Sequence, residues 1–128
     1  MGFLDRILAA EQADIHNDWK VLQEVHQLDS LISDSFNKPV VIFKHSIRCG
    51  TSAMAKFQLE QSWDFSAEDL DFYYLDLINH RKISNQIAEV LNVVHQSPQI
   101  IVLKNGEAVY NTSHTMISNA GIHAAIEN

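Results

Sequence analysis

The feature of this sequence that most limits its fold is the apolar run VVIFK at residues 40–44, which a helix-forming segment follows shortly afterwards. The break Asn-Lys-Pro at residues 37–39 precedes this run. A short β-branched and aromatic run bounded in this way is typical of a strand that is buried on both faces. Such a strand needs packing layers above and below it, and helices supply those layers in α/β proteins. The sequence therefore predicts an α/β domain built around residues 40–44.

The rest of the chain alternates between helix-like segments and apolar runs. The pair Asn105-Gly106 separates two such runs, which is a strong signal of a tight hairpin. In the helix after the central strand we expect Ala53 and Phe57 to share one face, and we expect Asn79 to cap the next helix. The expected elements are an edge strand within residues 18–22, helices within 24–36, 51–62 and 79–93, a strand at 71–77, a hairpin within 97–111, and a last helix from about residue 113 or 115.

This order of elements predicts how the strands pair. Strand–helix–strand units require parallel strands with right-handed crossovers, whereas the Asn-Gly turn adds an antiparallel edge. We therefore expect a mixed central sheet with helices on both faces. Residues 1–17 are polar with a weakly amphipathic start and are interpreted as an N-terminal arm, which leaves residues 18–128 as the folded domain.

Composition excludes several classes of protein. A chain of 128 residues is long enough for one domain with a sizeable core. Its net charge of −7 argues against a nucleic-acid groove or an anionic membrane surface as partner. The opening MGFLDRILAA is too short an apolar run for a secretory signal, and no run is long enough to cross a bilayer. We expect a cytoplasmic protein whose thiol is reduced.

The only cysteine, Cys49, lies at the junction between the central strand and the following helix. The start of a helix offers unpaired N–H groups and the positive end of the helix dipole, and both stabilise a thiolate. Ser52 is placed to donate its hydroxyl to the sulfur, and Lys44 and Arg48 are expected to add positive potential. Together these groups predict a thiol pKa of roughly 5–7 in place of about 8.5.

A single cysteine is more often a small buried hydrophobic residue, so the reactive interpretation needs a second feature. Pro98 supplies one, because it follows Ser97 at the start of a predicted strand. In this arrangement we expect a cis Ser97–Pro98 bond that lies opposite the thiol. A proline that merely opens a strand is the alternative. Taken together, Cys49 and Pro98 favour a reactive thiol.

The order of elements, the Cys-Gly-Thr-Ser motif at residues 49–52 and the Ser-Pro strand start resemble the thioredoxin superfamily. More narrowly, VVIFKHSIRCGTSAMAKF followed by VVHQSPQIIVLKNGEAVYNTSH resembles the monothiol bacilliredoxin-like (YtxJ-like) family, from about Trp19 to the C-terminus. The resemblance implies a thioredoxin-like fold and a role with bacillithiol, with Cys49 as the redox cysteine and Pro98 as the cis-proline. Gly50 is a departure, because related sequences often have proline there.

Ser52 occupies the position where a dithiol protein has its second cysteine, so Cys49 must exchange with an external thiol. We therefore expect a monothiol oxidoreductase that removes bacillithiol, or another low-molecular-weight thiol, from protein mixed disulfides. Ser97 and Pro98 are expected to bind the small thiol, and Lys44 to attract a carboxylate on it. The expected partners are S-bacillithiolated client proteins, the small thiol and a reducing partner protein. Bacillithiol is a co-substrate, and no other cofactor is expected.

Two other functions stay open from the sequence. Cys-Gly-Thr-Ser differs by one residue from the Cys-Gly-Phe-Ser motif of monothiol glutaredoxins, which carry an iron–sulfur cluster between two subunits. The third possibility is a non-catalytic adaptor of the same fold, in which Cys49 is inert. The seven histidines show no metal-ligand spacing, so no metal site is predicted. His45 and His95 fall near the expected thiol edge, without an assigned role.

Overall fold

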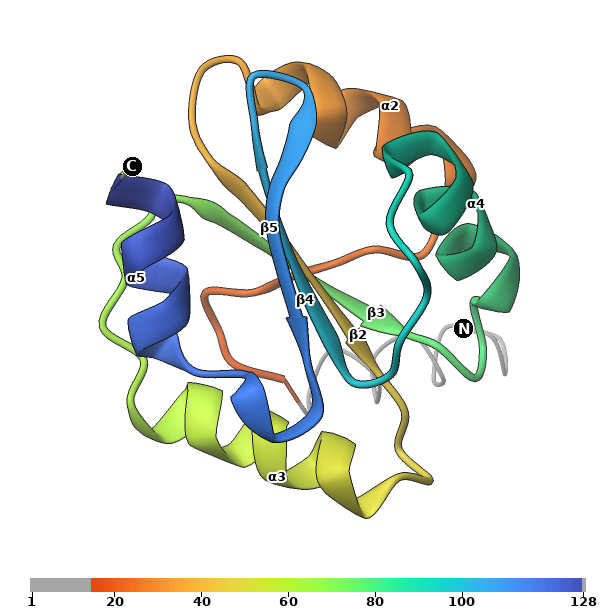
Figure 1. The fold of residues 1–128 in the computed structure, drawn as a ribbon, viewed down its shortest axis with the longest axis vertical. Coiled ribbons are helices and arrows are strands. Elements are labelled where there is room, and N and C mark those ends of the chain that lie inside the picture. Colours follow the sequence, from red (N-terminus) through yellow and green to blue (C-terminus); the bar gives the residue numbers. More distant parts are fainter. Residues whose placement is uncertain (1–14, 128) are drawn as a thin grey trace, which may run out of the picture.

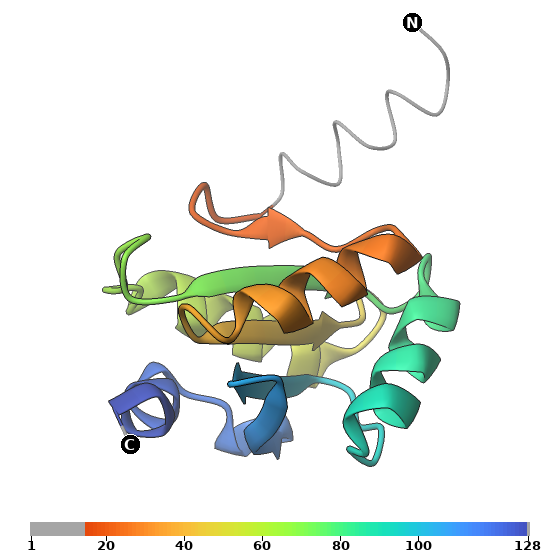
Figure 2. The ribbon, with the colours of Figure 1, turned by 90° about the horizontal axis from the view of Figure 1, so that it is seen from above.

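The computed structural model describes residues 15–127, which form a central sheet with helices on both faces (Figure 1). Its five strands lie in the order β1-β3-β2-β4-β5, and Figure 2 shows them stacked in that order. The predicted mixed α/β architecture is confirmed. The elements are β1 (Lys20–Val21), α2 (Val25–Asp34), β2 (Val40–His45), α3 (Gly50–Gln61), β3 (Asp71–Asp76), α4 (Arg81–Leu91), β4 (Gln99–Lys104), β5 (Glu107–Ser113), the 3₁₀ turn η1 (His114–Met116) and α5 (Asn119–Glu127).

The direction of β4 differs from the sequence prediction. Strands β1 and β2 run parallel to β3, but β4 runs antiparallel to β2, with Gln99 opposite Lys44. The expected parallel crossover through α4 is therefore wrong. The loop at residues 92–98 returns the chain to the carboxyl end of β2, so β4 starts where β2 ends. The predicted hairpin is confirmed, because Asn105 and Gly106 turn the chain at φ values of 54° and 82°.

Both faces of β2 are buried, as its apolar run predicts. Val41 and Phe43 belong to a cluster that includes side chains of α3 and α5. Val40 and Ile42 belong to a second cluster, with side chains of α2 and α4. All four side chains are fully buried, so β2 is held between two helical layers. The loop at residues 46–49 therefore starts from a strand that is fixed on both faces.

Ala53 and Phe57 share one face of α3, as predicted, and this face is not the buried one. Ala53 and Phe57 lie on its exposed side, and 57% of the Phe57 surface is open to solvent. The buried residues are Ser52, Ala55 and Leu59. The exposed pair and the buried residues both have helical spacing. Because the buried set includes the polar Ser52, hydrophobicity alone does not identify the buried face of α3.

Two predicted helix starts also need correction. The N-cap of α4 is His80 and not Asn79, whose side-chain amide donates to Asp76 Oδ2 at 2.7 Å. Helix α5 begins at Asn119, after η1, and it buries Ile122 and Ala125. The sequence did not predict a 3₁₀ turn between the last strand and the last helix.

The predicted N-terminal arm falls mostly outside the described residues, because residues 1–14 are not part of the description. Ile15 is buried and packs in the same cluster as Trp19, whose ring stacks on Phe72 at a centroid distance of 4.5 Å. Within residues 15–127, none of the helices combines the length and the apolar character that a membrane span requires.

Candidate active site

Cys49 lies where the sequence predicts, at the junction between β2 and α3. It is the N-cap residue of α3, with extended backbone angles of φ −109° and ψ 121°. Its N–H donates to Ser46 O at 3.1 Å, and its carbonyl oxygen accepts from Ala53 N at 3.1 Å. The residue is partly exposed and its thiol is free. The backbone N–H and carbonyl of Cys49 are therefore both hydrogen-bonded, while the sulfur stays accessible.

The pKa of the Cys49 thiol is lowered from its ordinary value, as predicted in direction. The largest cause is the hydrogen bond from the backbone N–H of Ser52 to the sulfur, followed among the favourable contacts by the N–H of Thr51 and the two hydroxyls. Partial burial of the thiol opposes these contacts. All the donors belong to the first turn of α3, so the start of the helix stabilises the thiolate.

Ser52 has a second contact besides Cys49. Its side chain is fully buried, and its Oγ accepts a hydrogen bond from Ser46 N at 3.3 Å. Ser52 thus connects the loop after β2 to the helix that carries the thiol. The residue in the resolving position of a dithiol protein here holds the loop and the sulfur together.

The prediction for Lys44 is wrong. Its side chain is fully buried, and its Nζ lies 3.2 Å from both Ser84 O and His95 Nδ1, on the α4 side of the sheet. Successive side chains of a strand point to opposite faces, so Lys44 lies on the face away from α3. It neither lowers the pKa of Cys49 nor reaches a ligand there. Burial lowers the pKa of Lys44 itself to about 8.

Arg48 is exposed, and it is not among the groups that shift the pKa of Cys49. The predicted contribution of a positive side chain therefore does not operate through either Lys44 or Arg48. The favourable contacts come from the start of α3, and neither of the two predicted cations is among them.

The Ser97–Pro98 bond is cis, as predicted. Because Gln99 pairs with Lys44, extending the antiparallel register by one residue places Pro98 across from His45, at the end of β2. Pro98 O also accepts from His114 N at 3.1 Å. Ser97 and Pro98 therefore lie at the end of the sheet where β2 finishes and the chain continues to Cys49. That the Ser97 backbone faces the thiol stays a prediction.

His45 is the last residue of β2 and has a role that the sequence did not show. Its ring is buried, and Nδ1 lies 3.1 Å from the Tyr74 hydroxyl. Burial, with a smaller contribution from nearby Lys56, lowers the pKa of His45 to about 4. His45 is therefore a neutral structural residue beneath the site at physiological pH.

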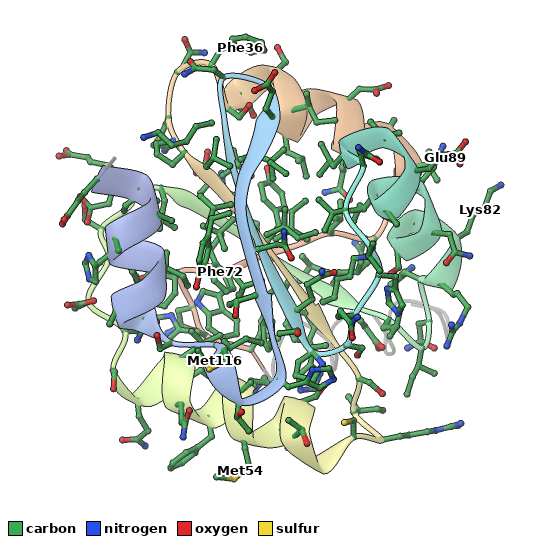
Figure 3. The ribbon with its side chains drawn as sticks, viewed as in Figure 1. Phe36, Met54, Phe72, Lys82, Glu89 and Met116 are labelled. Atoms are coloured by element: carbon green, nitrogen blue, oxygen red, sulfur yellow. The ribbon has the colours of Figure 1, made fainter. Side chains whose placement is uncertain are left out.

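A pocket of about 540 Å³ lies between α3 and η1, and its lining begins at Gly50, the residue after Cys49. Met54 and Met116 are exposed at this end of the molecule (Figure 3). Sequence reasoning missed the pocket, because it depends on the 3₁₀ turn that brings β5 round to α3. The lining residues are Gly50, Thr51, Met54, Ala55, Gln58, His114 and Thr115.

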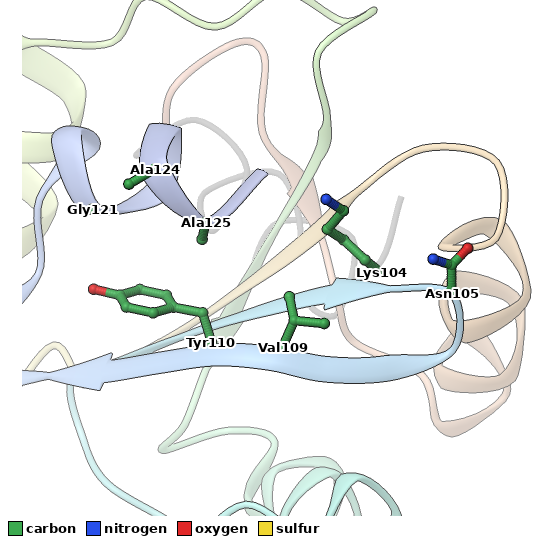
Figure 4. A pocket seen from close by; sticks show the side chains of 7 residues that line it. All are labelled: Lys104, Asn105, Val109, Tyr110, Gly121, Ala124 and Ala125. Atoms are coloured by element: carbon green, nitrogen blue, oxygen red, sulfur yellow. The ribbon is translucent and has the colours of Figure 1, made fainter. Parts of the chain in front are cut away.

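A further pocket, of about 500 Å³, lies at the other end of the sheet, between the β4–β5 hairpin and α5 (Figure 4). Residues of the hairpin and of α5 line it, and Lys104 Nζ donates to Ile126 O at 3.2 Å. It lies far from the thiol, because β4 runs away from the carboxyl end of β2.

Among residues 15–127, no three His, Cys, Asp or Glu side chains are grouped to hold a metal ion.

The mixed sheet, the cysteine at the start of the helix after a central strand, and the cis-proline at the start of the adjacent strand define a thioredoxin-fold redox protein. A solved structure described as a candidate oxidoreductase with a thioredoxin fold is 34% identical, with a TM-score of 0.72, and the match covers 84% of this chain and 93% of that one. Thioredoxins of Malassezia sympodialis and Fasciola hepatica share the fold at lower identity. The first is 20% identical with a TM-score of 0.67, covering 88% of this chain and 91% of that one. The second is 18% identical with a TM-score of 0.65, covering 84% and 96%.

The family assignment follows from a second comparison. The family model described as monothiol bacilliredoxin BrxC matches residues 20–122. The chain belongs to the monothiol bacilliredoxin family, and the resemblance seen in its sequence motifs is confirmed.

Proposed function

We propose that this protein is a thiol–disulfide oxidoreductase that removes bacillithiol, or another low-molecular-weight thiol, from mixed disulfides on client proteins. The observation that supports this most directly is the partly exposed Cys49 thiol, whose pKa is lowered by the first turn of α3. Membership in the monothiol bacilliredoxin family supports the choice of the small thiol. Cys49 is the proposed nucleophile.

The first step is a thiol–disulfide exchange. The Cys49 thiolate attacks the sulfur of the small thiol within the mixed disulfide, which forms a new S–S bond to Cys49 and breaks the bond to the client. The electron pair of the broken bond leaves with the client sulfur, and the resulting thiolate takes a proton from water. A lowered pKa raises the fraction of Cys49 present as thiolate, the form that attacks.

The second step regenerates Cys49. Ser52 cannot act as a resolving thiol, so a second molecule of the small thiol or a dithiol partner protein attacks the sulfur of the bound small thiol. The Cys49 thiolate is the leaving group, and a low pKa makes it a better one. The cycle therefore needs a supply of reduced thiol, and for this reason we place the protein in the cytoplasm. Bacillithiol is a co-substrate in this scheme.

Two regions of the site are proposed to hold the substrate. The backbone N–H and carbonyl of Ser97, next to Pro98 and across from the end of β2, would donate and accept hydrogen bonds to the small thiol, as an added strand does. The pocket between α3 and η1 is lined from Gly50, the residue after Cys49, and has room for side chains of the client. Its exposed methionines are adaptable surfaces for clients of different sequence.

The test follows the adduct. A client peptide carrying bacillithiol on its single cysteine is mixed with the protein, and intact mass spectrometry follows both partners with time. The wild type should take up one bacillithiol and release the free peptide, and Cys49→Ser should do neither. Equal transfer by Cys49→Ser would exclude the mechanism. A visible absorption band after anaerobic reconstitution with iron and sulfide would instead favour the cluster carrier, and alkylation no faster than that of a free thiol would favour the adaptor.

A further inference from the structure

A cluster of buried polar side chains lies on the sheet face that α4 covers, and the chemistry of Cys49 does not use it. Lys44, Ser84 and Gln99 are fully buried there, and His95 is half-buried beside them. Burying an ammonium group without a carboxylate partner is unfavourable, and an apolar residue would fill the same space without that penalty. The contacts of the cluster show what the polar groups provide.

The cluster connects α4 and β2 to the loop at residues 92–98. Lys44 Nζ donates to Ser84 O at 3.2 Å and lies 3.2 Å from His95 Nδ1, while Ser84 Oγ lies 3.3 Å from the same nitrogen. On the next strand, Gln99 Nε2 donates to Val94 O at 3.0 Å, and Gln99 Oε1 accepts from Gln96 N at 3.4 Å. The residues immediately before Ser97 are therefore held by side chains from the buried cluster.

We propose that Lys44 and His95 are positioning residues, which hold the loop so that Ser97 and Pro98 present their backbone to the thiol substrate of Cys49. The inference rests on the proposed function, because it assigns these two residues to the exchange reaction. Neither residue touches the sulfur. Their action runs through the loop, whose end lies across from the last residue of β2.

The contacts also determine the protonation state that the loop requires. The ammonium group of Lys44 can only donate, whereas the Ser84 hydroxyl can donate or accept, so the contact with Lys44 is favourable when His95 Nδ1 is the acceptor of a neutral ring. A proton on Nδ1 would place two donors against each other beside Lys44. The pKa of His95 is lowered by burial first and then by the charges of Lys44 from β2 and Arg81 from α4. We therefore expect the loop to be held at neutral pH and to be released in acid, at a pH below the ordinary pKa of histidine.

Two rates measured on the same protein separate positioning from thiol reactivity. Alkylation by iodoacetamide needs only the Cys49 thiolate, whereas transfer from a bacillithiolated fluorescent peptide also needs the loop. We expect His95→Leu and Lys44→Met to lower the ratio of transfer to alkylation by about tenfold, since small displacements of positioning groups have effects of this order or larger. His95→Asn, which keeps an acceptor near the place of Nδ1, should retain the wild-type ratio at pH 7. The exposed His26→Asn serves as the matched control.

The pH profile supplies a readout that does not depend on a disruptive variant. In the wild type the ratio should fall as the pH drops through the titration of His95, and in His95→Asn it should stay flat. A flat ratio in the wild type, or an unchanged ratio in His95→Leu, would overturn the inference while leaving the role of Cys49 intact. Absence of any transfer by the wild type would overturn the proposed function and this inference with it.

Discussion

The buried ammonium of Lys44 predicts an unusual dependence of stability on pH. Its pKa is about 8 in the folded protein, against 10.5 for an exposed lysine. The difference of about 2.5 corresponds to roughly 3 kcal/mol in the free energy of unfolding, at 1.36 kcal/mol for each pH unit. Burial is the cause, since the side chain is fully buried and its contacts within residues 15–127 are a carbonyl oxygen and a neutral imidazole.

The sign follows from proton binding. Below pH 8 both states hold the proton, and the native state bears the whole penalty of the buried charge. Between about pH 8 and 10.5 the unfolded chain keeps its proton while the native state loses it, so stability rises with pH. Lys44→Met removes this titration. Across this range the free energy of unfolding of the wild type should therefore rise, relative to that of Lys44→Met, by as much as roughly 3 kcal/mol.

Urea unfolding, followed by tryptophan fluorescence at several values of pH between 7 and 10, measures this difference. Both proteins carry Cys49→Ser, which removes the titration of the thiol. Other groups that titrate in alkali, such as Lys20 and Tyr73, are present in both and cancel in the comparison. Parallel stability curves for the two proteins would refute the assignment of a charged, buried Lys44.

Three further predictions test separate parts of the structure. Ser52→Ala should slow alkylation of Cys49 near neutral pH, because the sulfur loses one of its hydroxyl donors; an unchanged pH profile of alkylation would contradict the contact. Gly106→Ala should lower the free energy of unfolding by about 1 kcal/mol or more, since φ is +82° and the new Cβ would lie 2.7 Å from an aromatic carbon. Gly50→Ala is its control, because no atom lies within 4 Å of the added Cβ, and equal losses for both would contradict the reasoning. His45 should titrate near pH 4 by NMR, and its contribution to stability should be present above about pH 6.5 and be lost as the pH falls through 4; a midpoint near 6.5 would show that the ring is hydrated.

Local chemistry was sufficient to predict much of this protein. The turn at Asn105 and Gly106 was predictable because both positions need a positive φ, which these two residue types adopt readily. The position of Cys49 was predictable because an apolar β-branched run ends just before it and helix-forming residues begin just after it. The direction of its pKa shift followed from the helix start alone, without any tertiary contact.

The direction of β4 was beyond the sequence. The segment from α4 to β4 reads as an ordinary helix–loop–strand connection, and its periodicity is the same whether the strand returns parallel or antiparallel. Only pairing with β2 decides the direction, and this pairing brings Pro98 to the end of the strand that leads to Cys49. The cis bond and a place opposite the thiol were predicted, but the antiparallel pairing that brings Pro98 to this end of the sheet came from the fold.

Lys44 shows the same division most clearly. The sequence places it five residues before Cys49, which suggested a cation beside the thiol. In the folded protein it lies under α4, bound to Ser84 and to His95, a residue far away along the chain. Alternation along β2 determines that Lys44 and Phe43 point in opposite directions. Which helix covers which face depends on strand pairing over long separations, and because both faces of β2 are buried, no contrast between polar and apolar sides reveals it in the sequence.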